Sequence, residues 1–288
     1  MKILSLFDGM SCGRVALEQA GLKVDAYYAS EIDRHAIKVA QANWPRNIQL
    51  GDITNWREWD IDWASIDLVT GGFPCQAWSI AGKQLGDKDE RGMLFWTMLD
   101  VMKKVRKHNP KAHFLIENVK MKKEFEQYIT HHTKQALGEV HKILINSSIV
   151  APYDRPRYYW TSFEASCPSQ VELFFIDVVD GDLTPMSSGW HDWWLVNKQF
   201  QISKRYSKIN GPLDKGICMT ARQYASWNGN FVEVEGVVHK PNKKGLAKLC
   251  GVPINYFECA TQRQAEQMVG NGWTVSVISH LLGCAFKP

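Results

Sequence analysis

Short apolar segments alternate with segments of helical periodicity over the first 165 residues of this 288-residue chain. Apolar runs without a period of two are typical of strands that are buried on both faces, and helices between them fit crossovers between parallel strands. The pattern therefore predicts an α/β fold with a doubly wound parallel sheet and helices on both faces. The predicted strands are residues 3–7, 25–30, 66–70, 113–116, 143–150 and 158–163, and the predicted helices are residues 13–20, 34–44, 93–108 and 122–137.

The pattern changes after Cys167. Residues 168–245 are richer in Gly, Pro, Trp, Ser and Asn and have weak periodicity, which indicates a smaller, irregular or β-rich module. Helical spacing returns from Gly245, and residues 274–282 are apolar enough to join the main core. We therefore predict one domain from residues 1–165 with 246–288, and a second domain from residues 166–245.

Composition narrows the class of protein. The hydrophobic and charged fractions, 45% and 22%, are those of an ordinary globular protein, and no apolar stretch is long enough for a membrane helix. The first residues lack the features of a signal peptide. We expect a cytoplasmic protein without a membrane partner, in a bacterium or a phage-infected cell. The net charge of +4 is compatible with nucleic acid without requiring it.

The seven cysteines contain no CxxC pair and no Cys/His cluster with zinc spacing. They are expected to be reduced thiols in a protein without a metal. Most free cysteines are small buried hydrophobic residues, so one with a different role must be identified from its surroundings.

Ligands of open α/β sheets bind beyond the carboxyl ends of the strands. The first strand is followed by a glycine-containing turn that allows close approach of the backbone to a ligand. A plain connection between strand and helix is the alternative. The candidate residues of this turn are Phe7, Asp8, Gly9, Met10, Ser11, Cys12 and Gly13.

The next two strand ends carry acids. Glu31, after the second strand, is placed to accept the hydroxyls of a ribose. Asp52 could accept from an adenine amino group while Ile53 packs on the ring, or it could cap the next helix. The three residues favour an adenosine-containing ligand, and the absence of GxGxxG in the first turn weighs against NAD.

Residues 71–83 hold the strongest signal. Pro74-Cys75 follows a buried strand, so the thiol of Cys75 is expected at the ligand-binding edge, where it could act as a nucleophile. Glu117, after the strand at 113–116, is a candidate acid or hydrogen-bond partner beside it. Arg155 and Arg157 alternate along an extended segment, as contacts to phosphate or to a base oxygen require, although Arg pairs are more often solvated or ion-paired.

Several motifs together resemble the C5-cytosine DNA methyltransferases, over residues 1–165 and 245–288. Tyr153 and Trp273 replace residues that are usual in bacterial members, and they resemble the catalytic domain of the animal de novo DNA methyltransferases. The motifs that carry the resemblance are Phe7-Asp-Gly-Met-Ser-Cys-Gly13, Pro74-Cys-Gln76, Glu117-Asn-Val119, Arg155-x-Arg157 and Gly270-Asn271.

The resemblance implies a Rossmann-like fold that binds S-adenosylmethionine and releases S-adenosylhomocysteine. Cys75 would attack C6 of a flipped-out cytosine, Glu117 would hold its N3 and amino edge, and Arg157 would hold O2. Arg155 would support the loop or the charge of Cys75. The cofactor pocket would be lined by Phe7, Gly9, Glu31, Ile32, Asp52, Ile53 and Phe73 and closed by Asn271 and Trp273.

Double-stranded DNA is the implied partner. Residues 76–92 would form a loop that closes over DNA, with Gln76, Ser79, Lys83 and Arg91 as candidate contacts, although a solvated loop is an alternative. Basic and aromatic residues mingle between 190 and 244, and Arg222, in Thr220-Ala221-Arg222, is the candidate for a guanine contact. The protein would act as a monomer, and a cognate restriction enzyme could be encoded elsewhere.

Two alternatives stay open. A related activity would be cytosine methylation of tRNA, against which the sizeable region 166–245 argues. A protein of another class would bind cofactor and DNA without catalysis, but such a protein has no need for Cys75, Glu117 and Arg157 together.

Overall fold

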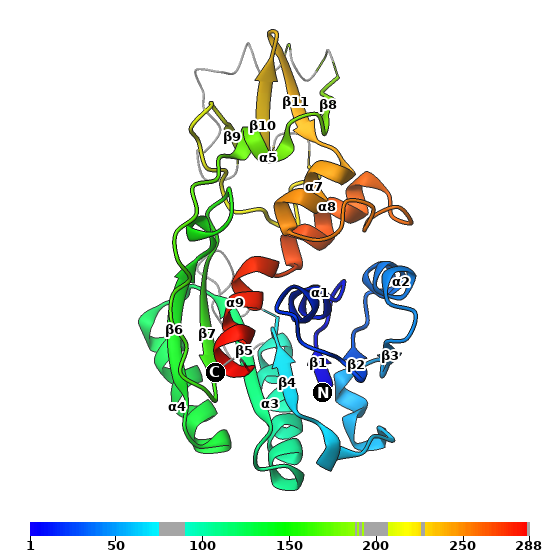
Figure 1. The fold of residues 1–288 in the computed structure, drawn as a ribbon, viewed down its shortest axis with the longest axis vertical. Coiled ribbons are helices and arrows are strands. Elements are labelled where there is room, and N and C mark those ends of the chain that lie inside the picture. The colour runs from blue at the N-terminus through cyan, green and yellow to red at the C-terminus, as the bar shows by residue number, and fades with distance from the viewer. Residues whose placement is uncertain (75–89, 188, 190–191, 193–206, 226–227, 287–288) are drawn as a thin grey trace. The chain divides into compact units, whose positions relative to one another are not determined.

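The computed structural model of the chain describes all residues except 75–89, 188, 190–191, 193–206, 226–227 and 287–288 (Figure 1). The chain forms two compact units. The first comprises Met1–Ile145, Pro156–Cys167 and Val277–Pro288, and the second comprises Asn146–Arg155 and Pro168–Ser276.

The first unit is built on a seven-stranded sheet with the order β3-β2-β1-β4-β5-β7-β6. Strands β1 to β5 run parallel to their neighbours, whereas β7 runs antiparallel to β5. The strands are β1 (Lys2–Leu6), β2 (Ala26–Ser30), β3 (Ile48–Gln49), β4 (Leu68–Gly71), β5 (His113–Val119), β6 (His141–Asn146) and β7 (Pro156–Thr161).

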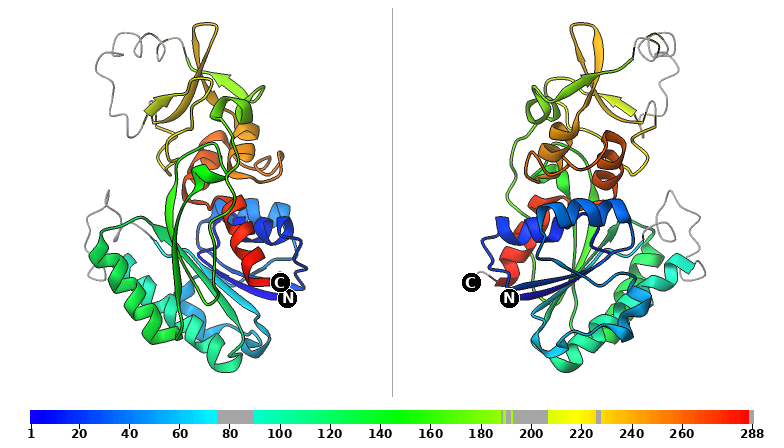
Figure 2. Two further views of the ribbon diagram at one scale, coloured as in Figure 1. Left: turned by 60° about the vertical axis from the view of Figure 1, so that its left-hand side comes forward. Right: turned by 90° about the vertical axis from the view of Figure 1, so that its right-hand side faces the viewer.

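Helices cover both faces of this sheet, which confirms the predicted α/β architecture. Figure 2 shows α1 (Cys12–Gln19), α2 (Arg34–Asn43) and α9 (Val275–Phe286) on one face, and α3 (Glu90–His108) and α4 (Lys123–Leu137) on the other. Two short 3₁₀ helices, η1 (Ile53–Glu58) and η2 (Trp63–Ser65), precede β4 and pack on α3.

The helical spacing predicted within residues 93–108 is explained by the core. Phe95, Met98, Leu99 and Met102 of α3 are each at most 1% exposed and pack against the central strands. Burial of such side chains contributes about 1.5–3 kcal/mol each, so this face of α3 is a main source of the stability of the unit.

The direction of β7 corrects the expectation of a wholly parallel sheet. The strand predicted at 158–163 is β7, which lies two residues earlier along the chain. It pairs antiparallel with β5, with Val119 opposite Arg157 at one end and Leu115 opposite Thr161 at the other. Hydrophobic periodicity identifies a strand but carries no information on its direction.

The second unit contains a four-stranded sheet with the order β8-β11-β10-β9, which agrees with the predicted β-rich module. Strands β10 and β11 form a hairpin whose two loop residues, Glu235 and Gly236, both have positive φ, as the favoured two-residue turn requires. The elements of the unit are η5 (Ser147–Ile149), α5 (Phe175–Val179), β8 (Leu183–Pro185), β9 (Ser207–Ile209), β10 (Gly229–Val234), β11 (Val237–Pro241), α7 (Lys243–Cys250) and α8 (Gln262–Asn271).

The contact-based units divide the chain differently from the predicted domains. Residues 246–276 were expected with the first domain, but they group with the second unit because α7 packs on α5, α8 and β11. Only residues 277–288 group with the large sheet. The functional division between catalysis and recognition stays a prediction.

Candidate active site

Three neighbouring strands, β1, β2 and β4, end at the same level of the sheet, because their final residues are paired in register, whereas β5 continues beyond this level to Val119. Leu6 of β1 pairs with Ser30 of β2 and Gly71 of β4, and Gly71 in turn pairs with Ile116 of β5. In parallel strands, the residues that follow must lie along one edge, which we name the carboxyl edge. Those residues are Phe7, Glu31, Gly72 and Glu117.

The turn after β1 has an unusual backbone. Phe7, Gly9 and Ser11 have φ values of 56°, 59° and 63°. A positive φ is uncommon for residues other than glycine, and such strain gathers at sites that bind ligands. A Cβ on Gly9 would have no heavy atom within 4 Å, so the backbone of Gly9 faces open space. The turn thus has the close-approach character that the sequence predicts for it.

Asp8 holds this turn together. Its carboxylate accepts hydrogen bonds from the hydroxyl groups of Ser11 and Tyr27, the latter at 2.6 Å. Burial raises the pKa of Asp8 to about 6, although these hydrogen bonds oppose the shift. Because the neighbouring Met10, Ser11 and Cys12 are each at most 3% exposed, they shape the turn from within.

Glu31 binds the backbone of the same turn. Its Oε2 accepts from Gly9 N at 2.7 Å, and its Oε1 accepts from the N–H groups of Ile32 and Asp33 at 2.8 and 2.9 Å. The side chain of Ile32 is 74% exposed at this edge. A carboxylate beside an exposed apolar side chain and an open glycine backbone suits the hydroxyls and the flat base of an adenosine moiety.

Three other expected cofactor contacts have structural roles. Asp52 accepts from Thr54 N at 2.8 Å and caps η1, which was the alternative for this residue. Ile53 and Phe73 are 4% and 2% exposed and belong to the core, where Phe73 lies 5.1 Å from Phe95 between ring centroids. Their contact with a cofactor stays a prediction.

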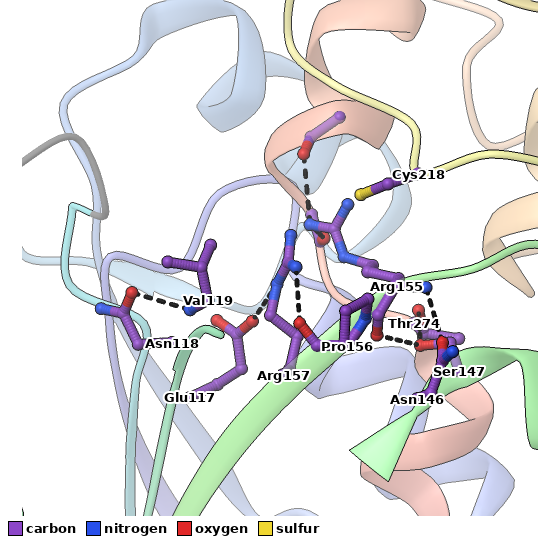
Figure 3. Close-up of polar contacts among 12 residues, drawn as sticks. Glu117, Asn118, Val119, Asn146, Ser147, Arg155, Pro156, Arg157, Cys218 and Thr274 are labelled. Atoms are coloured by element: carbon purple, nitrogen blue, oxygen red, sulfur yellow. Dashed lines mark hydrogen bonds and ion pairs between the residues drawn. The ribbon is translucent and has the colours of Figure 1, made fainter. Parts of the chain in front are cut away.

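Glu117 and Arg157 form an ion pair at the carboxyl edge (Figure 3). Arg157 Nε lies 2.9 Å from Glu117 Oε1, and the two side chains are 12% and 11% exposed. The antiparallel direction of β7 makes this pair possible, because Arg157 near its start then lies beside the end of β5, where it pairs with Val119. Arg157 also donates from Nη1 to the carbonyl of Pro156 at 2.9 Å.

Asn118, which follows Glu117, connects this pair to the chain before Cys75. Its buried side chain donates from Nδ2 to the carbonyl of Phe73 at 3.0 Å and accepts from Val119 N at 2.8 Å. No role for Asn118 was predicted from the sequence, although a buried amide near a strand end is a signal for such a backbone contact. Cys75, Gln76, Ser79 and Lys83 lie outside the described residues.

Arg155, predicted beside the catalytic residues, is a clamp inside the second unit. It is 4% exposed, and its guanidinium donates to the carbonyls of Met219 at 3.1 Å, Gly270 at 3.1 Å and Gly272 at 2.6 Å. The alternative that Arg155 supports a loop thus has structural support, and a catalytic role stays a prediction.

The remaining predicted residues belong to different elements. Asn271 ends α8 and Trp273 follows it, both in the second unit, so their closure of the cofactor pocket stays a prediction. Arg91 lies in α3, in the first unit, and Arg222 is exposed in the second.

Residues 198–244 were expected to carry their basic residues on a nucleic-acid face, but several of these lysines have partners inside the unit. Lys208 pairs with Asp214 at 3.1 Å, and Lys240 pairs with Glu266 at 3.2 Å. Lys215 donates to the carbonyl of Ala151 at 3.2 Å. These lysines stabilise the unit itself, which leaves Arg222 and Lys244 as exposed cations among the residues described in this region.

Metal-binding clusters and membrane-spanning helices are both absent from the described residues. Among the described residues, no group of three or more His, Cys, Asp or Glu side chains could hold a metal ion. In the same part of the chain, no helix combines the length and hydropathy needed to cross a membrane.

Comparisons with known proteins agree on one family. A family model described as "C-5 cytosine-specific DNA methylase" matches residues 1–173. The Type II methyltransferase M1.ScrFI of Lactococcus lactis subsp. cremoris is 31% identical over 96% of this chain and 76% of its own length. The Type II methyltransferase M.NlaX of Neisseria lactamica is 36% identical over 96% of this chain and 93% of its own length.

Solved structures share the fold. The Entamoeba histolytica methyltransferase EhMeth has a TM-score of 0.75 at 17% identity, over 99% of this chain and 98% of its own. The DNMT2 mutant of Spodoptera frugiperda has a TM-score of 0.71 at 18% identity, over 99% of each chain.

Proposed function

Because the chain belongs to the C-5 cytosine-specific DNA methylase family, whose members methylate cytosine with S-adenosylmethionine, we propose that it methylates C5 of cytosine in duplex DNA through a covalent adduct with Cys75. The observation that carries this proposal is the Glu117–Arg157 ion pair, which lies in line with the ends of β1, β2 and β4. Asn118 ties the same strand end to Phe73, two residues before Cys75.

The cofactor supplies an electrophilic methyl group when it is bound. The turn at residues 7–11 approaches it with the backbone, Glu31 accepts from its ribose hydroxyls, and Ile32 covers its base. The fit rests on the positive φ values of the turn, the open space at Gly9 and the exposure of Ile32.

C5 of cytosine is a weak nucleophile until a group adds at C6. In the proposed reaction the Cys75 thiolate forms a bond to C6 while N3 gains a proton through Glu117, and C5 then takes the methyl group. Loss of the C5 proton to a base breaks the S–C6 bond, and the proton on N3 returns to Glu117. 5-Methylcytosine and S-adenosylhomocysteine then leave, and the thiolate is restored.

Glu117 and Arg157 act on adjacent groups along one edge of the base. Glu117 holds the N3 and amino edge, and Arg157 holds O2. Their ion pair fixes both side chains before the base arrives, which reduces the reorganisation needed in the transition state. The target atom is inaccessible inside a stacked duplex, so the cytosine is flipped out of the helix.

Residues 166–245 recognise the target sequence in this proposal, and Arg222 is the guanine contact. The protein acts as a monomer on DNA and can be accompanied by a restriction enzyme encoded elsewhere. Support comes from the exposure of Arg222, whereas Lys208 and Lys240 of the same region are paired with Asp214 and Glu266.

A duplex with 5-fluorocytosine at the target tests the adduct. Fluorine at C5 cannot leave as a proton does, so the protein should remain bound through Cys75 and migrate as a stable complex in denaturing electrophoresis. The Cys75→Ser variant should form none. Cys167→Ser, at an exposed thiol, is the matched control and should react like the unchanged protein. A complex that survives in Cys75→Ser would exclude Cys75 as the nucleophile.

A further inference from the structure

An exposed arginine in the second unit is carried by a turn that is otherwise fixed from inside. The turn spans residues 219–225, and we name it the recognition turn. Arg222 is exposed at its tip, whereas Met219 and Gln223 on either side are 2% and 3% exposed. Hydrogen bonds from Gln223 N to Thr220 O at 3.1 Å and from Ala225 N to Arg222 O at 3.0 Å close it locally.

The first attachment of the recognition turn is a direct contact between backbones. A Cβ on Gly270 of α8 would lie 2.1–2.3 Å from the backbone atoms of Thr220 and Ala221, so only glycine allows this approach. Arg155 spans the contact, because its guanidinium donates to Met219 O and to Gly270 O, each at 3.1 Å.

The second attachment is a buried polar network that we name the lock: Gln223, Lys240 of β11 and Glu266 of α8. Lys240 Nζ lies 3.2 Å from Glu266 Oε1 and also donates to Gln223 O. Gln223 Nε2 donates to Glu266 O at 2.7 Å, which closes the network. The Lys240 and Glu266 side chains are 13% and 5% exposed.

Stability alone is a poor explanation for the lock. Burying an ion pair costs as much desolvation energy as its attraction returns, and well-packed apolar residues would stabilise the unit as well. A satisfied buried network does fix one arrangement of its members, because any other leaves a charge unpaired. Gln262 adds to this arrangement by donating to Glu266 Oε1 at 3.0 Å.

We propose that Gln223, Lys240 and Glu266 are positioning residues that determine target specificity, because they hold the recognition turn so that Arg222 meets one base edge of the DNA. The inference rests on the proposed function, in which the second unit recognises duplex DNA. A bidentate contact between arginine and guanine needs a fixed guanidinium, and a loose turn would let Arg222 reach neighbouring bases.

The test removes the lock and measures target choice. The variants are Glu266→Gln, which is close to isosteric, and Lys240→Met with Glu266→Gln, which removes both charges. Lys248→Met with Asp182→Asn is the matched control, since it removes a Lys–Asp pair of 2.6 Å from the same unit without touching the turn. Cytosine methylation of plasmid DNA is mapped at base resolution below the Tm of every variant, and kcat and KM are measured on a duplex with the target sequence.

The lock variants should raise the fraction of methylation outside the target sequence by roughly tenfold, as expected for loss of one base contact. KM for DNA should rise, whereas kcat should stay within about threefold of that of the unchanged protein, because the proposed catalytic residues lie in the other unit. The single variant Arg222→Ala should also raise the fraction of off-target methylation. Adding the lock substitutions to Arg222→Ala should raise this fraction no further. The control should keep the original target choice.

Unchanged target choice in both lock variants would overturn the inference, and so would additive losses with Arg222→Ala. A stability loss equal to that of the control, without a change in specificity, would assign the lock a structural role only. Failure of the proposed function gives a different result, because the unchanged protein would then methylate no cytosine in DNA, and the inference would fall with it.

Discussion

Glu117 and Arg157 face each other across neighbouring strands, and each holds the other in place. Arg157 Nε lies 2.9 Å from Glu117 Oε1 at a site where both side chains are almost buried. A charge-assisted hydrogen bond in such surroundings is stronger than one in water. In the proposed reaction, the pair is therefore suited to hold adjacent groups on one edge of a planar base.

Glu117→Gln should separate catalysis from folding. The amide keeps the shape but can neither pair with Arg157 as an anion nor pass a proton, so kcat should fall by about 10²–10⁴-fold, while the affinity for S-adenosylmethionine is unchanged. Glu126→Gln is a matched control. Glu126 lies on α4 and is a buried carboxylate that is paired with Lys142 of β6. A kcat for Glu117→Gln within threefold of the control would contradict the role of Glu117.

Asp8 makes stability depend on pH in a definite direction. Burial raises its pKa from 3.8 to about 6, so the folded protein favours the protonated form. The contribution of Asp8 to the free energy of unfolding is fully present below pH 3.8 and is lost as the pH rises through 6. Asp8→Asn removes this titration.

Relative to the unchanged protein, the free energy of unfolding of Asp8→Asn should therefore rise between pH 4 and pH 7, by about 1–3 kcal/mol after allowance for partial exposure. Urea unfolding at several pH values measures it. A difference between the two proteins that does not change with pH would show that Asp8 titrates normally in the fold.

At the scale of elements, the sequence predicts most of the first unit. Its apolar runs lie within a few residues of β1, β2, β4, β5 and β7, because strands buried on both faces are continuously apolar. The two-residue β3 was missed, since so short a strand carries no periodic signal. The predicted strand at 143–150 covers four of the six residues of β6 and runs past its end, because Asn146 accepts from Ser148 N and η5 starts there.

The candidate site was predictable in its residues but less so in its geometry. Glu117 and Arg157 were identified separately, and the antiparallel pairing that joins them follows from the tertiary structure alone. Lys240 was assigned to a basic face, yet it is buried because its partner Glu266 lies on an element far along the chain. Charge counted along a sequence cannot show which cations are paired inside the fold.

Gly270 and Gly283 provide a test of how closely α8 packs on the recognition turn. Gly270→Ala places a Cβ 2.1 Å from the backbone of Thr220 and should lower the free energy of unfolding by about 3 kcal/mol or more. Gly283→Ala in α9 meets nothing within 4 Å and should stabilise the protein by about 0.5–1 kcal/mol. Thermal unfolding of both variants tests these two predictions, and equal Tm values for Gly270→Ala and Gly283→Ala would contradict the close backbone contact.

At the scale of the whole molecule, the proposed function assigns catalysis and target recognition to different units. The turn at residues 7–11, Glu31 and the Glu117–Arg157 pair belong to the unit with the large sheet, whereas Arg222 and the lock belong to the other. Substitutions at Glu31, Glu117 and Arg157 should therefore change the rate, and substitutions at Arg222 and the lock should change the choice of target.

The most direct test of this account is methyl transfer from labelled S-adenosylmethionine to unmethylated duplex DNA, with tRNA in parallel, followed by base-resolution mapping of modified cytosines. The account predicts label on C5 of cytosine in DNA at one recurring short sequence, and none in tRNA. Label on tRNA alone, or on neither nucleic acid, would contradict it.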